Sequence, residues 1–356
     1  MTPSNKHSLG VGKQTIDWLF NEQLKVDEEW VVETPKGFRW WADSNAQTVE
    51  VIGQETGPDG EPGYFVSVRT ELLRSVDLDE HTLEAINTFL LPLASMAGPV
   101  YDPHDRSLSL CSLVRVHGGI SQWMNPLISV AAVLQIDEAR SAASMLAKVL
   151  NAEESISGHP QHGLRPEPDE MATMFETMIA PMGQESSRWM DEEFQDVVDQ
   201  YMNQPPSLLG TAGGAGFTVE FPYGSQSSLC QATADQPHPR YGSGLLVLQS
   251  FPLSGISKTD GIKLALSMNE IELTQKPFGY GLGSYAYKES TIYFTSFVPN
   301  AAYSPGLLPN IYFSCAQRAK EMSIRLTNQD WSPEAFTPRR SALGRMIDRI
   351  RGRTHS

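Results

Sequence analysis

The sequence has few residues of the kinds that mark secreted, metal-binding or membrane-spanning proteins. Its 356 residues include three cysteines, Cys111, Cys230 and Cys315, and no C-x-x-C pair. This spacing argues against a disulfide framework or a zinc site, and the apolar neighbours predict buried free thiols in a reducing compartment. No stretch approaches the roughly 20 apolar residues that span a bilayer, and the N-terminus MTPSNKHSLGVGKQ lacks the apolar segment of a secretory signal. We therefore expect a cytoplasmic protein.

Sequence motifs of known catalytic chemistry are also missing. The chain contains no G-x-S-x-G, H-E-x-x-H, G-x-x-x-x-G-K-[ST] or EF-hand pattern. The sequence DPHD at 102–105 could offer ligands to one metal ion, but proline and aspartate between two strands are ordinary turn residues. His159 and His162 lie in a polar stretch where a surface pair is expected. We therefore predict no catalytic residue, no metal and no cofactor.

Positive charge is scarce except at the C-terminus. The formal net charge is −15, and residues 339–356 carry six arginines against one aspartate, which leaves −20 on the rest of the chain. An acidic body repels nucleic acid and anionic membranes at long range. We therefore expect no nucleic-acid partner, although the basic tail could act differently over short distances.

Hydrophobic patterning in the first half alternates between helical and strand-like periods. Helices are predicted at 14–24, at 79–96 and from Asn125 to about Leu150, because Asn125 and Pro126 have the form of an N-cap followed by a first-turn proline. The strands are predicted at 37–43, 47–53, 64–73, 98–102 and 106–118. The first half thus reads α-βββ-α-ββ-α.

The second half repeats this order of patterns. The run that begins at Leu108 matches the run that begins at Ile292, and the strand at Tyr64 matches the strand at Leu245. We predict an α+β protein of two similar domains, each an antiparallel sheet of about five strands with helices packed on one face. The predicted units are residues 1–155, residues 156–330 with an extra linker helix at about 168–182, and a basic tail at 331–356.

Three alternating glycines at 279, 281 and 283 in FGYGLGSYAYKESTIYFTSFV could suggest a phosphate-binding loop. Such a loop lies between a strand and a helix, with the helix N-terminus facing the phosphates. Here the glycines follow a helix and precede two alternating runs separated by KES. This order predicts a β-hairpin, with the glycines at a bulge, a bend or a close approach of backbones.

Two groups of residues are candidates for binding a partner. Trp40 and Trp41 are adjacent on a strand and face opposite sides of it, so one is expected in the core and the other either covered by a helix or exposed as an anchor. In the tail, Leu343, Met346, Ile347 and Ile350 share one helical face surrounded by arginines. The tail candidates are Arg339, Arg340, Arg345, Met346, Arg349 and Ile350. Such a helix binds a membrane or a partner groove, or else the tail is solvated or docks on its own acidic body.

The order of patterns resembles the type III secretion chaperone-like fold and its YbjN-like relatives, of the tandem type found in actinobacteria. The segments that carry the resemblance are GYFVSVRTELL, LEAINTFLLPL and SLSLCSLVRV in the first half, and GLLVLQSF, IKLALSMNEIEL and TIYFTSFV in the second. The resemblance implies an internal pseudo-dimer, in a chain that is a monomer or dimer. It also implies a protein that binds other proteins and is not an enzyme.

We therefore expect a non-enzymatic, chaperone-like or regulatory protein that presents tandem domains to a partner chain. The partner would be another protein, basic or partly disordered, bound at a sheet edge or a helix face. The alternative is a peripheral membrane or envelope-associated regulator that makes weak membrane contact through the basic tail. A third hypothesis is an enzyme with an unrecognised site between the domains.

Overall fold

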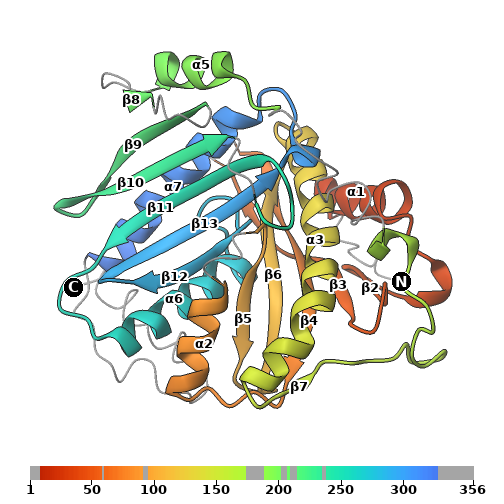
Figure 1. The fold of residues 1–356 in the computed structure, drawn as a ribbon. Helices are drawn as coiled ribbons and strands as arrows, with labels where there is room; N and C mark the ends of the chain where they lie inside the picture. Colours follow the sequence, from red (N-terminus) through yellow and green to blue (C-terminus); the bar gives the residue numbers. More distant parts are fainter. Residues whose placement is uncertain are drawn as a thin grey trace, which may run out of the picture.

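The computed structural model describes residues 9–57, 60–90, 95–173, 188–201, 207–208, 215–234 and 238–327. It confirms an α+β fold with two antiparallel sheets, each carrying a long helix on one face (Figure 1). The basic tail, and the predicted linker helix beyond its helical residues 170–173, lie outside these ranges. No helix within them is long and apolar enough to cross a membrane.

The first sheet has seven strands in the order β1-β2-β3-β4-β6-β5, with β7 beside β4. Helix α3 packs on β4 and β6, and α1 packs nearby on β3 and β4. The elements are α1 (Gly10–Trp18), β1 (Val31–Thr34), β2 (Gly37–Trp40), β3 (Gln47–Thr56), β4 (Pro62–Arg74), α2 (Glu80–Leu90), β5 (Gly98–Asp102), β6 (Ser107–Val116), α3 (Ser121–Val149) and β7 (Glu153–Glu154). A π-helical turn at Leu19–Gln23 extends α1, and a 3-10 turn at Glu28–Trp30 precedes β1.

The second sheet has six strands in the order β8-β9-β10-β11-β13-β12. Helix α7 packs on β9 and β11, and α5 packs on α7 and β9. The elements are α5 (Asp191–Tyr201), β8 (Ser207–Leu208), β9 (Gly216–Tyr223), β10 (Gln226–Ala234), β11 (Gly244–Pro252), α6 (Lys258–Thr274), β12 (Ser284–Lys288), β13 (Thr291–Pro299), a 3-10 turn (Asn300–Ala302) and α7 (Leu307–Leu326).

The two halves have the same topology. Strands β2-β3-β4-β6-β5 of the first sheet correspond in order to β9-β10-β11-β13-β12 of the second, and α2 and α6 occupy the same place in the chain order. This confirms two similar α-βββ-α-ββ-α units. Hydrophobic residues from both halves nevertheless belong to one continuous core.

Side-chain alternation explains why the central strands form where predicted. In β11, Leu245, Val247 and Phe251 are buried, while Leu246, Leu248 and Ser250 are half-exposed. The Gln249 amide, buried with them, donates to the Cys315 carbonyl at 2.9 Å, which shows that these odd-numbered residues face α7. Helix α6 begins where Ser257 accepts a hydrogen bond from the Asp260 backbone amide, an N-cap of the usual kind.

Several local features of the structure were not predicted from the sequence. Helix α3 begins at Ser121, one turn before the predicted Asn125, because the Ser121 and Met124 amides bond to carbonyls of the turn at 117–120. Pro126 therefore lies inside the helix, and the Asn125 side chain instead accepts from the Thr15 hydroxyl at 2.9 Å. Strand β1, only four residues long, was not predicted. Helix α7 begins at Leu307 after Gly306, whose φ of 81° only glycine adopts readily.

The two halves join through a pair of equivalent backbone contacts. Leu113 on β6 and Gly281, just before β12, donate to each other's carbonyls at 2.9 and 2.8 Å. In the reciprocal position, the Phe297 amide on β13 donates to the Ser95 carbonyl at 3.2 Å. Each half thus places the segment before its edge strand against the last strand of the other, as a two-fold interface requires.

Close backbone contacts, at this joint and within the second half, explain the glycine-rich segment. Strands β12 and β13 form the predicted hairpin, and the glycines before it lie where backbones approach closely. A side chain at Gly281 would meet the Leu113 carbonyl, and one at Gly279 would meet the Ser314 carbonyl. The hydrogen-bonding edge of β12 is covered by asparagines: Asn269 and Asn87 each bond to the amide and the carbonyl of one tyrosine, Tyr285 and Tyr287 respectively.

The segment after β7 packs on the first sheet. The Ser157 amide donates to the Ser44 carbonyl at 2.9 Å, and the Asp169 amide donates to the Ala42 carbonyl at 2.7 Å. Arg165 adds a hydrogen bond to the Trp41 carbonyl at 2.9 Å. Residues 156–173, assigned from the sequence to the second unit, therefore lie against the first.

We predict that Gly281→Ala lowers the free energy of unfolding by about 1–3 kcal/mol, because the added methyl group overpacks the joint. Its carbon would lie 2.7 Å from the Leu113 carbonyl oxygen. The matched control is Gly118→Ala, where no atom lies within 4 Å of the added carbon; its change should stay within about 0.5 kcal/mol. Equal effects of the two substitutions in urea unfolding would show that the joint does not limit stability.

Candidate protein-interaction site

The two tryptophans proposed from the sequence are both buried. The exposed fraction is 0% for Trp40 and 3% for Trp41. The Trp40 indole donates to the Gln47 side chain at 3.0 Å, and the Trp41 indole donates to the Ser157 hydroxyl at 3.1 Å. Trp41 is thus covered, by the segment after β7 and not by a helix, and neither indole is exposed for a partner. The six tail candidates lie outside the described residues.

The histidine pair belongs to a turn that occurs twice. In HPQHG the amides and carbonyls of His159 and Gly163 bond to each other, and those of His238 and Gly242 do the same in HPRYG. In both turns the first histidine accepts two backbone N–H bonds on Nδ1. His159 is buried, contrary to the expected surface pair. The repeated H-P-x-x-G was the signal in the sequence that could have identified both turns.

The DPHD segment is a turn between β5 and β6, as its composition indicates. Asp102 accepts a hydrogen bond from the His104 amide at 2.9 Å, and the His104 ring bonds to Asp105. This contact with Asp105 raises the pKa of His104. In the described part of the chain, no three His, Cys, Asp or Glu side chains gather as ligands for a metal ion.

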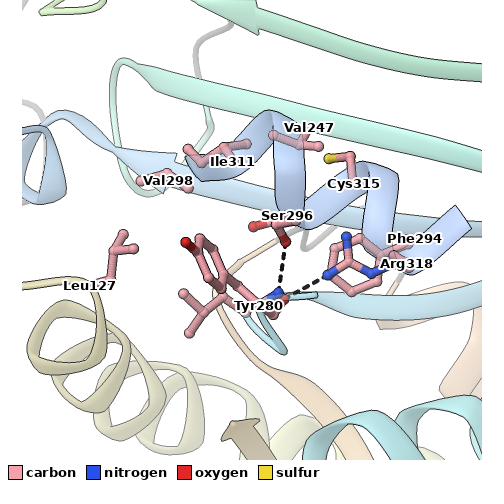
Figure 2. A pocket seen from close by; sticks show the side chains of 11 residues that line it. Leu127, Val247, Tyr280, Phe294, Ser296, Val298, Ile311, Cys315 and Arg318 are labelled. Atoms are coloured by element: carbon pink, nitrogen blue, oxygen red, sulfur yellow. Dashed lines mark hydrogen bonds between the residues drawn. The ribbon is translucent and has the colours of Figure 1, made fainter. Parts of the chain in front are cut away.

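A small cavity lies between α7, β13 and the loop that carries Tyr280, and Leu127 of α3 approaches it from the first half (Figure 2). About 20 Å³ of it is open to the centre of a water molecule, which is room for a single water. The Tyr280 amide donates to the Ser314 hydroxyl at 2.7 Å, and its carbonyl accepts from Arg318 at 2.6 Å. The polar groups of Tyr280, Ser314 and Arg318 therefore bond to one another, and the cavity is too small for a metabolite.

Arg318 and Glu272 form an ion pair in the core beside this cavity. Their side chains are 1% and 0% exposed, and the closest N–O distance is 2.9 Å. Tyr285 donates its hydroxyl proton to the same carboxylate, and the guanidinium lies 3.5 Å from the centre of the Phe294 ring. Burial opposes the charge on Arg318, but Glu272 outweighs it and raises the pKa of the guanidinium. The pair links α6 to α7 and has no access to a substrate.

Glu138 occupies a second small cavity, between the two halves. The cavity is lined by residues of both halves, including Ser95, Ala97 and Ser284. The Tyr241 hydroxyl donates to Glu138 at 2.6 Å, and Arg240 pairs with the neighbouring Asp137. Burial raises the pKa of Glu138 to about 7, although Tyr241, Ser95 and Arg240 favour its charged form. The charge of Glu138 therefore changes near neutral pH.

The three thiols are buried, as predicted. Burial raises the pKa of Cys111 to about 12. Cys230 on β10 and Cys315 on α7 interact, which raises the pKa of Cys230 and lowers that of Cys315. A reactive cysteine must also be accessible, so none of the three is placed for nucleophilic catalysis.

The face of the second sheet that points away from α7 is the largest contrast between the two halves. In Figure 1 α7 lies behind the strands, and this face is turned toward the viewer. Its side chains come from alternate residues of β10, β11 and β13. Thr295 and Phe297 of β13 are buried on this face, whereas seven other residues are half-exposed or exposed. They are Leu229, Gln231, Thr233, Leu246, Leu248, Ser250 and Tyr293. We call this surface the open face.

The strand register gives the first-sheet residues that correspond to the open face. The joint makes Leu113 and Phe297 equivalent, and their cross-strand partners are Ser67 and Leu246. Continuing along the paired strands gives three further equivalent positions. They are Arg69 and Leu248, Glu71 and Ser250, and Glu50 and Thr233. Charged residues of the first sheet thus correspond to uncharged residues of the second.

Arg69 and Glu71 of the first sheet bond to neighbours on their own face. Arg39 and Glu71 form an ion pair at 2.6 Å, and Arg69 donates to the Ser109 hydroxyl at 3.0 Å. Among the described strand residues of the open face, only Glu220 on β9 and Lys288 on β12 add charge. The first face has the composition of a solvated surface, whereas the open face has that of an interface.

We predict that Arg318→Met destabilises the fold by about 3–5 kcal/mol, because it leaves the Glu272 carboxylate buried without its cation. The double variant Arg318→Met with Glu272→Leu should lose less than the sum of the two single variants, since neither charge is then left alone. Urea unfolding of the four proteins measures the coupling. Strict additivity would show that the pair does not act as a unit.

We predict that stability declines between about pH 4.5 and pH 7 through Glu138. Its folded-state pKa of about 7 exceeds the ordinary value of 4.5, so folding favours the protonated form, and the stabilisation is lost as pH rises to the folded-state pKa. Glu138→Gln should remove this slope and stabilise the protein by about 2–4 kcal/mol above pH 7. Unfolding curves at pH 5 and pH 8 provide the test; the same difference between variant and parent at both values would contradict it.

Comparison with known proteins adds no assignment to these observations. No family model matches the chain, and no curated protein or solved structure matches it either. We therefore infer its function from the described residues.

Proposed function

We propose that this chain is a non-enzymatic, chaperone-like or regulatory protein of the cytoplasm that binds a partner protein on the open face. One observation carries the proposal: Leu248, Ser250 and Thr233 stand where the equivalent face of the first sheet has Arg69, Glu71 and Glu50. The resemblance to tandem YbjN-like and type III secretion chaperone-like proteins supports a binding role of this kind.

The composition of the open face favours association. Leu229 is 37% exposed, and Leu246, Leu248 and Tyr293 are half-exposed on the same face. Covering these side chains removes apolar area from water, which contributes roughly 25 cal/mol per Å². Because few charges lose their water there, little of this gain is offset by desolvation. Tyrosine and leucine on a rigid sheet also lose little conformational freedom on binding.

The sheet face is a better site than either sheet edge at the joint. Addition of a partner strand requires free N–H and C=O groups along an edge. At β12 these groups are bonded to the side chains of Asn269 and Asn87. Strand β5, the corresponding edge of the first sheet, packs against α6 and β12. Both edges at the joint are therefore occupied.

The charges around the site define the chemistry of the partner. Glu220 lies on the open face beside Leu229, and the chain outside residues 339–356 carries a net charge of −20. An acidic surround attracts a basic partner and increases its association rate. We therefore expect a segment with apolar anchors for the leucines and Tyr293, flanked by lysine or arginine.

The proposal is tested by photo-crosslinking in native extract with p-benzoylphenylalanine in place of Leu229. We expect one main protein adduct, reduced at least fivefold by the second substitution Leu248→Arg, which places the charge of Arg69 on the open face. Leu248 is half-exposed, so this substitution should change stability by no more than about 0.5 kcal/mol.

The matched control carries the probe in place of Glu50, the first-sheet equivalent of Thr233. It should not yield the same adduct. An adduct that forms equally from both positions, or one that Leu248→Arg leaves unchanged, would exclude the open face as the binding site.

A further inference from the structure

The described chain ends at one end of the second sheet, beside the turn between β9 and β10. Helix α7 ends at Leu326, and the Ser323 hydroxyl in its last turn accepts a hydrogen bond from the Gly224 amide at 2.9 Å. Gly224 is in the turn between β9 and β10. Among the open-face residues named above, the row closest to this turn contains Leu229, Ser250 and Tyr293, which are successive cross-strand neighbours, with Glu220 beside Leu229. The chain therefore continues from the end of the sheet where this row lies.

We propose that the C-terminal segment 339–353 packs its apolar stripe on the open face of the same chain and covers it until a partner displaces it. This inference rests on the proposed binding role of that face. Residues 328–338 form the connection, and 11 residues span at most about 40 Å. A nine-residue strand is about 30 Å long, so the connection reaches any part of the face.

The chemistry of the segment matches the face. Leu343, Met346, Ile347 and Ile350 recur at helical spacing, and they would cover the exposed leucines and Tyr293. The arginines around the stripe would lie near Glu220 and over an acidic body, which favours this contact by charge. A tethered segment also has an effective concentration in the millimolar range. Even a weak contact would thus cover the face most of the time.

Two other occupants fit less well. A second copy of the chain would bring together two molecules that each carry −15, which repel each other. An anionic membrane would attract the tail arginines but repel the −20 of the remaining chain. When the segment packs on its own chain, its positive charge is attracted by the negative charge of the body, and no like charges are brought together. We therefore expect it to lower the apparent affinity for a partner about ten- to hundredfold.

The test uses the full chain with p-benzoylphenylalanine in place of Met346, irradiated at low micromolar concentration. We expect intramolecular adducts in peptides that contain 226–234, 244–252 or 291–299. Leu248→Arg should reduce them at least fivefold, whereas Arg69→Leu, on the equivalent face of the first sheet, should leave them unchanged. Moving the probe to Asp348, roughly opposite Met346 on a helix, should give few such adducts.

Adducts on the outer side of α7, adducts between two chains, or no adduct would each overturn the inference. With phosphatidylglycerol vesicles present, replacement of the sheet adducts by lipid adducts would also overturn it, in favour of a membrane role. If the probe at Met346 fails to label the sheet while the probe at Leu229 still captures a partner, the binding role stands and the intramolecular contact of the tail does not. If Met346 labels the sheet but the Leu229 probe captures no partner, the intramolecular contact stands and the partner-binding role does not.

Discussion

The contact of backbone with backbone at the joint constrains the rest of the structure. Leu113 and Gly281 form a two-way pair of hydrogen bonds across the halves, and Phe297 with Ser95 completes the equivalent contact on the other side. Only a residue without a side chain permits this approach at Gly281. The joint fixes how the sheets lie relative to each other, and the edge strands beside it are covered: Asn269 and Asn87 bond to β12, and β5 packs against α6. The parts of the outer sheet faces that this contact leaves uncovered are free to differ between the two halves.

Buried polar groups stabilise the two halves by related but different means. In the first half the Gln47 amide donates to the Ala132 carbonyl of α3 at 2.9 Å; in the second the Gln249 amide donates to the Cys315 carbonyl of α7 at the same distance. These glutamines come from different strands, β3 and β11, yet serve long helices at the same place in each unit. The repeat thus preserves a requirement, a donor for a buried helix carbonyl, and not a particular residue.

The sequence predicts the order of elements well because each strand and helix has a strong period of its own. Leu245, Val247 and Phe251 alternate toward α7, and that alternation is visible without any structure. The open face could not be found in this way, since it depends on which strands pair and in what register. Trp41 was misleading for a related reason: what covers it is a distant segment at Ser157. The start of α3 was missed because the Asn125 side chain accepts a hydrogen bond from Thr15 and does not cap the helix.

The difference between the two outer faces calls for a physical cause. In water a charged side chain on a sheet face is well solvated, and Arg69 and Glu71 show that this fold accommodates charge at these positions. A leucine at the equivalent position of the second sheet gains little from folding while it stays half-exposed, and it increases the tendency to associate. Leu248 beside Leu229 and Tyr293 is therefore unfavourable for a surface that meets only water. The arrangement becomes favourable once another segment covers it, because the same apolar area then leaves water without desolvating charges.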